Sequence, residues 1–197
     1  MTLYLTSDPH LGHAKVAELR GYANAETHDL AVMHSYAETL TPNDDLWILG
    51  DISSGSSTGE RHALATLAQL AEETGARLHL VAGNHDSCSP IHRNAWRRHA
   101  VFLAVFESVQ SLARRRGPDR RDVLMSHYPY PAAGDGPHRP GARYQYARVP
   151  DGPAWLLHGH THQPERLSGP RSIHVGWDAW RRPVPWHEIE TLIKENA

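Results

Sequence analysis

The sequence has little cysteine, no long apolar run and no excess of one charge, and each shortage excludes something. Its 197 residues contain a single cysteine, Cys88, so no disulfide can form within the chain. No apolar run approaches the roughly 18 residues that a membrane-spanning helix requires. The first ten residues also lack the basic and apolar regions of a secretion signal. We therefore expect a cytoplasmic protein without a membrane partner.

The charges are nearly balanced, with 20 Lys and Arg residues, 22 Asp and Glu residues and a formal net charge of −2. A balance of this kind neither favours nor excludes a polyanionic partner. The sequence carries no strong nucleic-acid signal and gives no information on oligomeric state. One basic cluster surrounds Gly117 and Pro118, and we expect a solvated hairpin tip there rather than a nucleic-acid patch. Its members are Arg114, Arg115, Arg116, Arg120 and Arg121.

Histidine, in contrast, is abundant. The chain has 16 histidines, and histidine is the commonest metal ligand. Three of them, His158, His160 and His162, are crowded together at the end of a short apolar run. The length and the otherwise ordinary composition predict one domain that spans residues 1–197. A metal site within a single domain is therefore the first hypothesis to test against the rest of the sequence.

Short apolar runs alternate with helical patterns in the first half of the chain. The apolar runs predict strands, and the helical spacing between them predicts helices. Thr27 and Thr58 are the expected N-caps, and Gly75 is the expected helix stop. This β-α-β-α-β order implies parallel strands with right-handed crossovers. The expected strands are 2–6, 45–50 and 77–83, and the expected helices are 13–22, 27–40 and 58–75.

The second half of the chain has a different pattern. Residues 101–116 and 120–127 flank a Gly-Pro-Asp turn and resemble a hairpin, so we expect mixed sheets. Residues 128–153 are rich in proline and glycine without periodicity, which predicts a long loop of the functional or disordered kind. Further strands are expected at 122–127, 154–159 and 172–175, and a short helix at 187–197.

Side chains that can bind a metal follow the ends of five expected strands. In an open α/β sheet, ligands bind outside the carboxyl ends of the strands, because the loops converge there. Asp8 and His10 are two residues apart, as are His160 and His162. In extended backbone each pair would point to one side. The other candidates after strand ends are Asp51, Asn84, His85, Asp86 and His127.

The donor types indicate a pair of ions. Aspartate, histidine and asparagine without cysteine suit Mn, Fe or Zn rather than a soft thiolate site. These candidates are too many for one tetrahedral ion, whereas two ions that share a bridging carboxylate could use seven of them. Centres of this kind commonly hydrolyse esters at phosphorus. His79 and His158 lie inside apolar runs, so we expect them to be packed rather than to be ligands.

The order and spacing of these residues resemble the five motif blocks of the calcineurin-like metallophosphoesterases. A single block occurs by chance in many chains, but the five together are specific. The resemblance covers positions 8 to 162 and implies an α/β fold, the four-layer αββα sandwich of two mixed sheets flanked by helices. The sequence resembles in particular the small stand-alone members of bacteria and phages. The blocks are Asp8-x-His10, Gly50-Asp51, Gly83-Asn84-His85-Asp86, His127 and Gly159-His160-Thr161-His162.

The resemblance also implies the cofactor, which is a pair of divalent metal ions. Mn²⁺ is the expected occupant, and Fe, Zn or Ni are the alternatives. The ligands that the resemblance implies are Asp8, His10 and His162 for one ion, Asn84, His127 and His160 for the other, and Asp51 as the bridge.

The catalytic residues implied by the same blocks are His85 and Asp86. His85 would protonate the leaving oxygen or stabilise charge in the transition state, and Asp86 would hydrogen-bond His85 into position. Asn84, His85 and Arg143 are the expected substrate contacts, Arg143 because arginine suits a phosphate. Asp178, in a Gly-x-Asp sequence similar to the ending of small members, belongs either to the site or to a turn. Other loop residues proposed for the pocket are His138, Arg139, Tyr144 and Tyr146.

The implied reaction is hydrolysis of phosphodiester bonds by in-line attack of a metal-bridging hydroxide. The compact chain lacks a large cap insertion, and small stand-alone relatives are often phosphodiesterases. We therefore expect a small nucleotide diester, such as a 2′,3′- or 3′,5′-cyclic nucleotide. A phosphomonoesterase or a nucleotide pyrophosphohydrolase is the alternative enzyme. A catalytically inactive metal-binding scaffold is the alternative outside enzymes, although the intact His85 argues against it.

Overall fold

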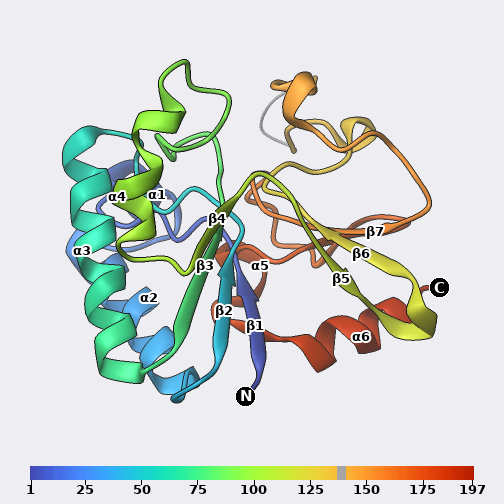
Figure 1. Ribbon diagram of the computed structural model, residues 1–197, viewed down its shortest axis with the longest axis horizontal. Coiled ribbons are helices and arrows are strands. Elements are labelled where there is room, and N and C mark those ends of the chain that lie inside the picture. The colour runs from blue at the N-terminus through green and yellow to red at the C-terminus, as the bar shows by residue number, and fades with distance from the viewer. Residues whose placement is uncertain (137–140) are drawn as a thin grey trace.

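Two five-stranded sheets form the centre of the computed structural model, which describes residues 1–136 and 141–197 (Figure 1). In the first sheet, β1 to β4 are parallel and β10 runs antiparallel beside β1. The expected parallel pairing of the first three strands is thus confirmed. In spatial order the sheet consists of β10 (Val184–Pro185), β1 (Leu3–Thr6), β2 (Asp45–Ile48), β3 (Arg77–Val81) and β4 (Ser108–Gln110).

The second sheet is also mixed. Its three central strands are parallel, and the two edge strands run antiparallel to their neighbours. The predicted hairpin is present, because Ala113 lies opposite Met125 and Arg116 lies opposite Asp122. In spatial order the sheet consists of β5 (Ala113–Arg116), β6 (Asp122–Met125), β7 (Trp155–His158), β9 (Ser172–His174) and β8 (Leu167–Gly169).

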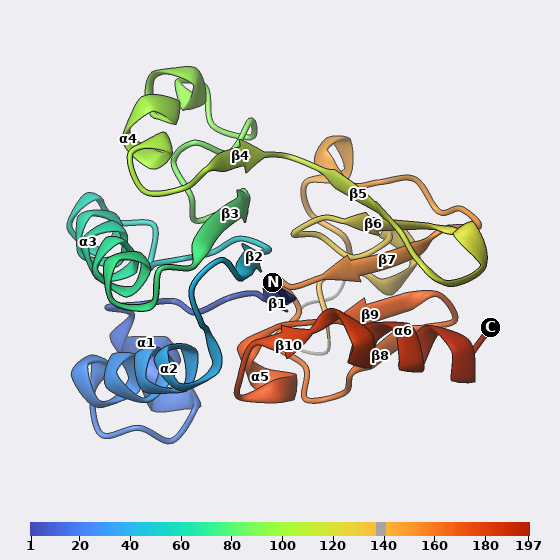
Figure 2. The same ribbon diagram turned by 60° about the horizontal axis from the view of Figure 1, so that its bottom comes forward.

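The helices flank the sheets. Helices α1 to α4 lie on the outer side of the first sheet, and α6 lies below the second sheet (Figures 1 and 2). The predicted α/β architecture of two mixed sheets with flanking helices is therefore confirmed. The helices are α1 (Ala14–Leu19), α2 (Ala25–Thr39), α3 (Ser57–Thr74), α4 (His99–Leu103), α5 (Trp177–Trp180) and α6 (Trp186–Glu195). Single 3-10 turns occur at Ala95–Arg97, Pro118–Arg120, Pro131–Ala133 and Gln145–Ala147.

Two apolar cores hold these layers together. One core fills the space between the first sheet and its helices, with Val32 of α2 and Leu67 of α3 fully buried. The other fills the space between the sheets, with Leu5 of β1 against residues such as Leu157 of β7. Ile189 of α6 belongs to this second core. Burial of each such side chain stabilises the fold by about 1.5–3 kcal/mol, so the cores fix the two sheets relative to each other.

The long helices begin earlier than the sequence pattern predicted. The side chain of Asn24 accepts a hydrogen bond from the Thr27 N–H, while the Thr27 hydroxyl accepts one from the Asn24 N–H. This capping box makes Asn24 the N-cap of α2. Ser56 caps α3 through a bond from Gly59 N–H. The expectation that Thr27 and Thr58 are N-caps is therefore wrong, because better-placed polar side chains precede both.

Other expectations need smaller changes. Within the apolar stretch 101–116, residues up to Leu103 belong to α4 and Ser108–Gln110 pair parallel with β3, so only Ala113–Arg116 form the hairpin. His138 and Arg139 lie outside the described residues. Arg114, Arg115 and Arg116 are exposed on the hairpin, as expected. Within the described residues, no helix has both the length and the apolar character needed to cross a membrane.

Candidate metal centre

The loops that follow strands of the two sheets meet at one place. Asp8 follows β1 in the first sheet, and His160 follows β7 in the second. The His160 N–H donates a hydrogen bond to Asp8 Oδ2 at 2.9 Å, although the two residues are 152 positions apart. His127 follows β6, and its carbonyl accepts from Gly159 N–H at 3.0 Å. The expected convergence at the carboxyl ends of the strands is therefore present.

The first cluster consists of Asp8, His10 and His162. One ligand atom from each residue lies within 4.8 Å of the others. Nε2 of His10 is 3.2 Å from Nε2 of His162, and each is 3.9 Å from Asp8 Oδ1. Asp8 is fully buried, and its Oδ1 has no hydrogen-bond partner among the described residues. A buried carboxylate oxygen with no partner indicates a cation site.

The second cluster consists of Asp51, His127 and His160, again within 4.8 Å. Nε2 of His127 lies 3.2 Å from His160 Nδ1 and 3.5 Å from Asp51 Oδ2. It also lies 3.2 Å from Asn84 Oδ1. The four side chains that were expected around the second ion and the bridge therefore lie together.

Asp51 lies between the clusters. Its Oδ2 atom is 3.9 Å from His10 Nε2 of the first cluster and 3.5 Å from His127 Nε2 of the second. Its other oxygen, Oδ1, accepts the backbone N–H of His85 at 2.7 Å. One carboxylate oxygen thus faces both groups of nitrogen donors, which is the position that a bridging ligand requires.

The backbone of the site is unusual. Five of the seven residues have left-handed backbone, with φ of 56° at Asp8, 48° at His10, 55° at Asp51, 70° at His160 and 53° at His162. The expectation that the Asp8–His10 and His160–His162 pairs are extended is therefore wrong. Tight turns, rather than strand geometry, aim the paired side chains inward. Non-glycine residues in this conformation cluster at functional sites.

Hydrogen bonds at Nδ1 of His10 and His127 determine that Nε2 of each ring is the atom that can bind a cation. His10 Nδ1 lies 2.9 Å from Ser53 O, and His127 Nδ1 lies 2.8 Å from Leu49 O. A carbonyl accepts, so each Nδ1 carries the proton and each neutral ring has a lone pair on Nε2. These lone pairs face other acceptors across the centre. Cations relieve that repulsion, so the donor set fits a pair of divalent ions.

The protonation states of three of these ligands agree with that requirement. Burial lowers the pKa of His160 to about 3 and the pKa of His10 well below its ordinary value, so both rings are neutral at pH 7. Burial alone would raise the pKa of Asp8, but His162 and His127 lower it overall. Metal ligands have to be neutral imidazoles and ionised carboxylates. The folded chain therefore presents these groups in the state that binds a cation.

Residues 1–164, which contain all of the clustered side chains, match the calcineurin-like phosphoesterase family. The chain belongs to this family. Members are metal-dependent phosphoester hydrolases with a dinuclear centre, so the predicted enzyme class and the predicted pair of ions are confirmed at that level. The identity of the metal is a separate question.

Relatives that align over nearly their whole length support the assignment. This phosphoesterase is 39% identical over 200 residues to the gene 66 proteins of Mycobacterium phages L5 and D29. The alignments cover 96% and 98% of this chain and 93% and 96% of theirs. A crystal structure of a protein of unknown function from Aquifex aeolicus superposes over 97% of this chain and 98% of its own, with a TM-score of 0.66 and 22% identity. That likeness shows a shared fold.

An ion pair holds His162 of this phosphoesterase from behind. The ring donates from Nδ1 to Asp178 Oδ2 at 2.9 Å, and Arg20 donates to both Asp178 oxygens at 2.8 and 2.6 Å. Burial alone would raise the pKa of Asp178, but His162 and Arg20 lower it far below its ordinary value. Asp178, which the sequence left as either a site or a turn residue, thus orients a ring of the first cluster.

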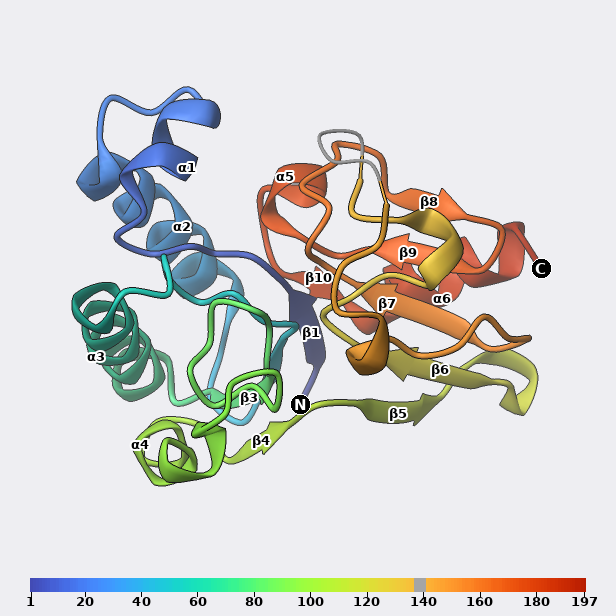
Figure 3. The same ribbon diagram turned by 90° about the horizontal axis from the view of Figure 1, so that it is seen from above.

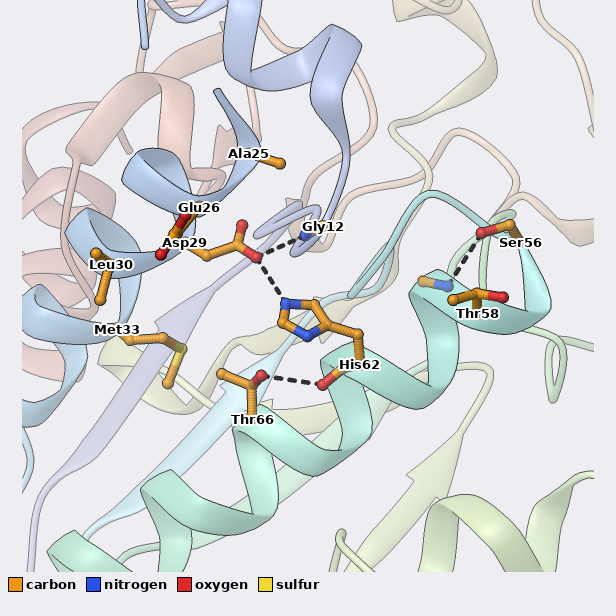
Figure 4. Close-up of a pocket in the computed structure, with 11 residues that line it drawn as sticks. Gly12, Ala25, Glu26, Asp29, Leu30, Met33, Ser56, Thr58, His62 and Thr66 are labelled. Atoms are coloured by element: carbon orange, nitrogen blue, oxygen red, sulfur yellow. Dashed lines mark hydrogen bonds and ion pairs between the residues drawn. The ribbon is translucent and has the colours of Figure 1, made fainter. Parts of the chain in front are cut away.

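A chain of hydrogen bonds continues from this ion pair to the surface. Arg20 contacts His28 Nε2 at 2.9 Å, and His28 Nδ1 contacts Asp29 Oδ1 at 3.1 Å. Asp29 Oδ2 then accepts from His62 Nε2 at 2.8 Å, inside a cavity of about 650 Å³ between α2 and α3 (Figure 4). These buried polar groups therefore connect the first cluster to the cavity between α2 and α3.

His85 and Asp86 occupy different environments. His85 is 38% exposed, its Nδ1 donates to Ser54 O at 3.0 Å, and its Nε2 lies 3.9 Å from Asp51 Oδ2. Asp86 is fully buried and accepts the N–H groups of Asp51 and Ile52 at 2.9 and 3.0 Å. The expectation that Asp86 hydrogen-bonds His85 is therefore wrong. Asp86 instead fixes the loop that carries Asp51.

Arg143, an expected substrate contact, is held in an ion pair with Asp135. Its Nε lies 2.5 Å from Asp135 Oδ2, and the buried Arg148 contacts the other oxygen of Asp135. Asp135 Oδ1 is in turn 3.3 Å from His160 Nε2. Asp135 therefore contacts a ring nitrogen of His160, just as Asp178 contacts a ring nitrogen of His162. Sequence reasoning missed Asp135 because the aperiodic loop gave no sign of which residue would fold back.

The histidines inside apolar runs are packed, as expected. His158 is fully buried, and its ring contacts Gly159 O and Ser168 Oγ rather than either cluster. His79 stacks on Trp47 with 4.8 Å between ring centres. Histidines inside strands are therefore packed, whereas histidines in the loops after strands are the candidate ligands.

Proposed function

We propose that this phosphoesterase hydrolyses phosphodiesters of small nucleotides and that Mn²⁺ is the physiological metal. The observation that carries the proposal is the position of Asp51, whose Oδ2 faces donors of both clusters while its Oδ1 holds the loop of His85. That arrangement supports two ions at close range with a partly exposed proton donor beside them. Such a site suits in-line displacement at phosphorus.

The roles of the ligands follow from the clusters. Asp8, His10 and His162 would hold one ion, His127 and His160 with Asn84 the other, and Asp51 both. When bound, the two dications lower the pKa of a water molecule and neutralise phosphoryl oxygens. The protein supplies the fixed geometry, because each ring is held by an acceptor on its outer side.

His85 is suited to act on the leaving group. Its Nδ1 proton is used by Ser54 O, so the ring is oriented with Nε2 toward the centre. A proton on Nε2 can pass to the oxygen that leaves phosphorus. Asn84, next to it, can contact the substrate as well as an ion. Asp86, by contrast, supports Asp51 and has no contact with the reacting atoms in this proposal.

The charges favour a diester over a monoester. A monoester phosphate is a dianion and benefits from free cations beside the metals, whereas a diester carries one charge. On the His160 side of the centre, Arg143 and Arg148 are both held in ion pairs with Asp135, so neither guanidinium is free to bind a substrate there. Tyr144 lies 6.5 Å from the His160 ring between ring centres and offers a face for a base, which favours a nucleotide. A cyclic nucleotide is the smallest such diester.

The test compares bis-p-nitrophenyl phosphate with p-nitrophenyl phosphate, each with Mn²⁺ and with a chelator. We expect Mn²⁺-dependent turnover with a preference for the diester. A preference for p-nitrophenyl phosphate would favour the monoesterase, and turnover of neither would favour an inactive scaffold. A panel of 2′,3′- and 3′,5′-cyclic nucleotides and of nucleoside diphosphate derivatives then separates cyclic diesters from pyrophosphate substrates.

A variant of His85 tests its role independently of metal binding. His85→Ala should keep both ions by elemental analysis while losing turnover by about 10²–10⁴-fold, the usual contribution of a general acid. His34→Ala, at an exposed histidine of α2, is a matched surface control for loading. A metal-free His85→Ala protein would show that His85 is a ligand instead.

A further inference from the structure

A second cavity adjoins the metal centre on the side of His85. Its volume is about 560 Å³, and its lining includes Asn84, His85, Ser87, Arg93 and Arg98. The loop that forms it, residues 84–98, rises beside the upper end of the first sheet, as the views in Figures 1 and 3 show. Because His85 lines the cavity, a group that leaves phosphorus toward His85 would enter this space.

The cavity has an uncompensated positive charge. Arg98 is used internally, since it donates to Glu60 at 2.8 Å and to Ser87 Oγ at 3.1 Å. Arg93 is exposed, and among residues 1–136 and 141–197 no carboxylate lies within ion-pair distance of it. The side chains in the lining include no carboxylate. Arg93 is therefore a free guanidinium at the rim of a cavity with polar donors.

We propose that this cavity binds a second phosphate carried by the leaving group of the substrate, and that Arg93 recognises it. This inference rests on the proposed function and narrows its substrate class. Arginine suits phosphate because its planar guanidinium can donate two parallel hydrogen bonds. A volume of about 560 Å³ lies within the usual range of small-molecule sites, so a phosphorylated nucleoside fits in size.

The chemistry places the second phosphate on the leaving side. Oxygen from water bonds to phosphorus, the ester P–O bond breaks, and its electron pair stays on the leaving oxygen. The proton from His85 Nε2 neutralises that oxygen. A simple cyclic nucleotide carries no second phosphate and would leave Arg93 unused. A linear dinucleotide with a terminal phosphate would use both the metal centre and the cavity.

The kinetic test uses three dinucleotides, ApA, pApA and ApAp, in the presence of Mn²⁺. Wild-type protein should prefer one of the phosphorylated forms over ApA by about tenfold or more in kcat/KM, the scale of a charged hydrogen bond. Arg93→Ala should remove that preference. Arg97→Ala is the matched control, because Arg97 lies near Arg93 in the sequence, over the Trp96 ring, and does not line the cavity. It should keep the preference.

Two results would overturn the inference: equal kcat/KM for all three dinucleotides, or a preference that survives Arg93→Ala. Turnover of bis-p-nitrophenyl phosphate by the wild type is measured alongside, so failure of the proposed function is recognised separately. Calorimetric binding of adenosine 3′,5′-bisphosphate and of AMP then tests the cavity without turnover. We expect tighter binding of the bisphosphate by wild type and by Arg97→Ala, and no difference between the nucleotides for Arg93→Ala. Equal binding by wild type contradicts the proposal.

Discussion

Several of the candidate ligand residues have a strained, left-handed backbone conformation. Asp8, Asp51 and His160 adopt a conformation that costs a non-glycine residue of order 1–3 kcal/mol. Neighbouring glycines make the turns possible. Gly50 has φ of 89°, and a Cβ atom there would lie 2.6 Å from His127 Nδ1. The free energy of binding two ions can offset this strain in the loaded protein.

The Asp178 carboxylate gives a prediction at the scale of one residue. Asp178→Asn removes the charge that orients His162 and pairs with Arg20, so the affinity of the first cluster for Mn²⁺ should fall about 10–100-fold. Titration calorimetry measures the loss. Asp151→Asn, in an exposed turn, should bind Mn²⁺ like the wild type. Unchanged affinity in Asp178→Asn would show that the ion pair only stabilises the fold.

The side chains that gather at the site could be predicted from the sequence, and their supports could not. Asp51 and His127 lie within three residues of the ends of apolar strands, so their place at the sheet end followed from pattern alone. Asp135 reaches His160 because a loop without periodicity folds back. Asp86 was misplaced because neighbours in sequence, such as His85, need not be hydrogen-bond partners. Contacts made by loops depend on tertiary packing that no local pattern encodes.

At the scale of elements, length decided what the sequence could predict. The runs at β1, β2 and β3 are apolar and separated by long helical segments, so their parallel order could be predicted. Strand β10, with two residues, and helix α5, with four, could not be predicted. Elements this short are stable only when they pack against their neighbours in the fold. The apolar stretch that became α4 looked like a strand, since short apolar runs fit either structure.

The cap of α3 gives a prediction for an element. Ser56→Ala removes the side chain that accepts from Gly59 N–H and should lower the free energy of unfolding by about 1 kcal/mol. Thr58→Ala, at the position that the sequence pattern favoured, lies inside the helix and should change it by less than about 0.5 kcal/mol. Urea denaturation of both variants measures the difference. The reverse order would place the cap at Thr58.

The turn that leads into β2 gives a prediction about pH. Desolvation would raise the pKa of Asp44, but hydrogen bonds from Thr41 and from Thr2 N–H lower it overall. A carboxyl with a lowered pKa stabilises the fold above its unfolded pKa, and that contribution is lost as pH falls through the folded pKa. Asp44→Asn should therefore cost about 1 kcal/mol at pH 7.

Urea denaturation of Asp44→Asn and wild type between pH 7 and pH 3 measures this dependence. The stability difference between them should shrink as the pH falls below about 4, because the carboxyl of the unfolded chain takes up its proton there and the folded one does so at lower pH. A difference that stays constant over this range would show that the charge of Asp44 has no part in the effect.

At the scale of the molecule, each cluster draws donors from both sheets. Asp8 and His10 follow a strand of the first sheet, while their partner His162 follows one of the second. The second cluster combines Asp51 with His127 and His160 in the same way. Ions that bind only the folded chain should therefore stabilise the contact between the sheets.

Thermal unfolding tests this coupling. Mn²⁺ at 100 times its dissociation constant should add about 2.7 kcal/mol for one site, a rise in the unfolding midpoint of about 5 °C or more. A chelator should reverse the rise. Differential scanning calorimetry with stepwise addition of Mn²⁺ measures it. A midpoint that does not move with Mn²⁺ would mean that the clusters do not bind this metal in the folded state.

The antiparallel partner of β1 has a consequence for biosynthesis. Strand β1 has β2 on one side, but on the other it pairs with Val184 and Pro185, which are translated much later. While the ribosome is still making the segment between them, that side of β1 offers unpaired backbone groups to any passing strand. Only after β10 has been made can it cover them, so the interval of translation before that point leaves this protein open to misassembly and to chaperone binding.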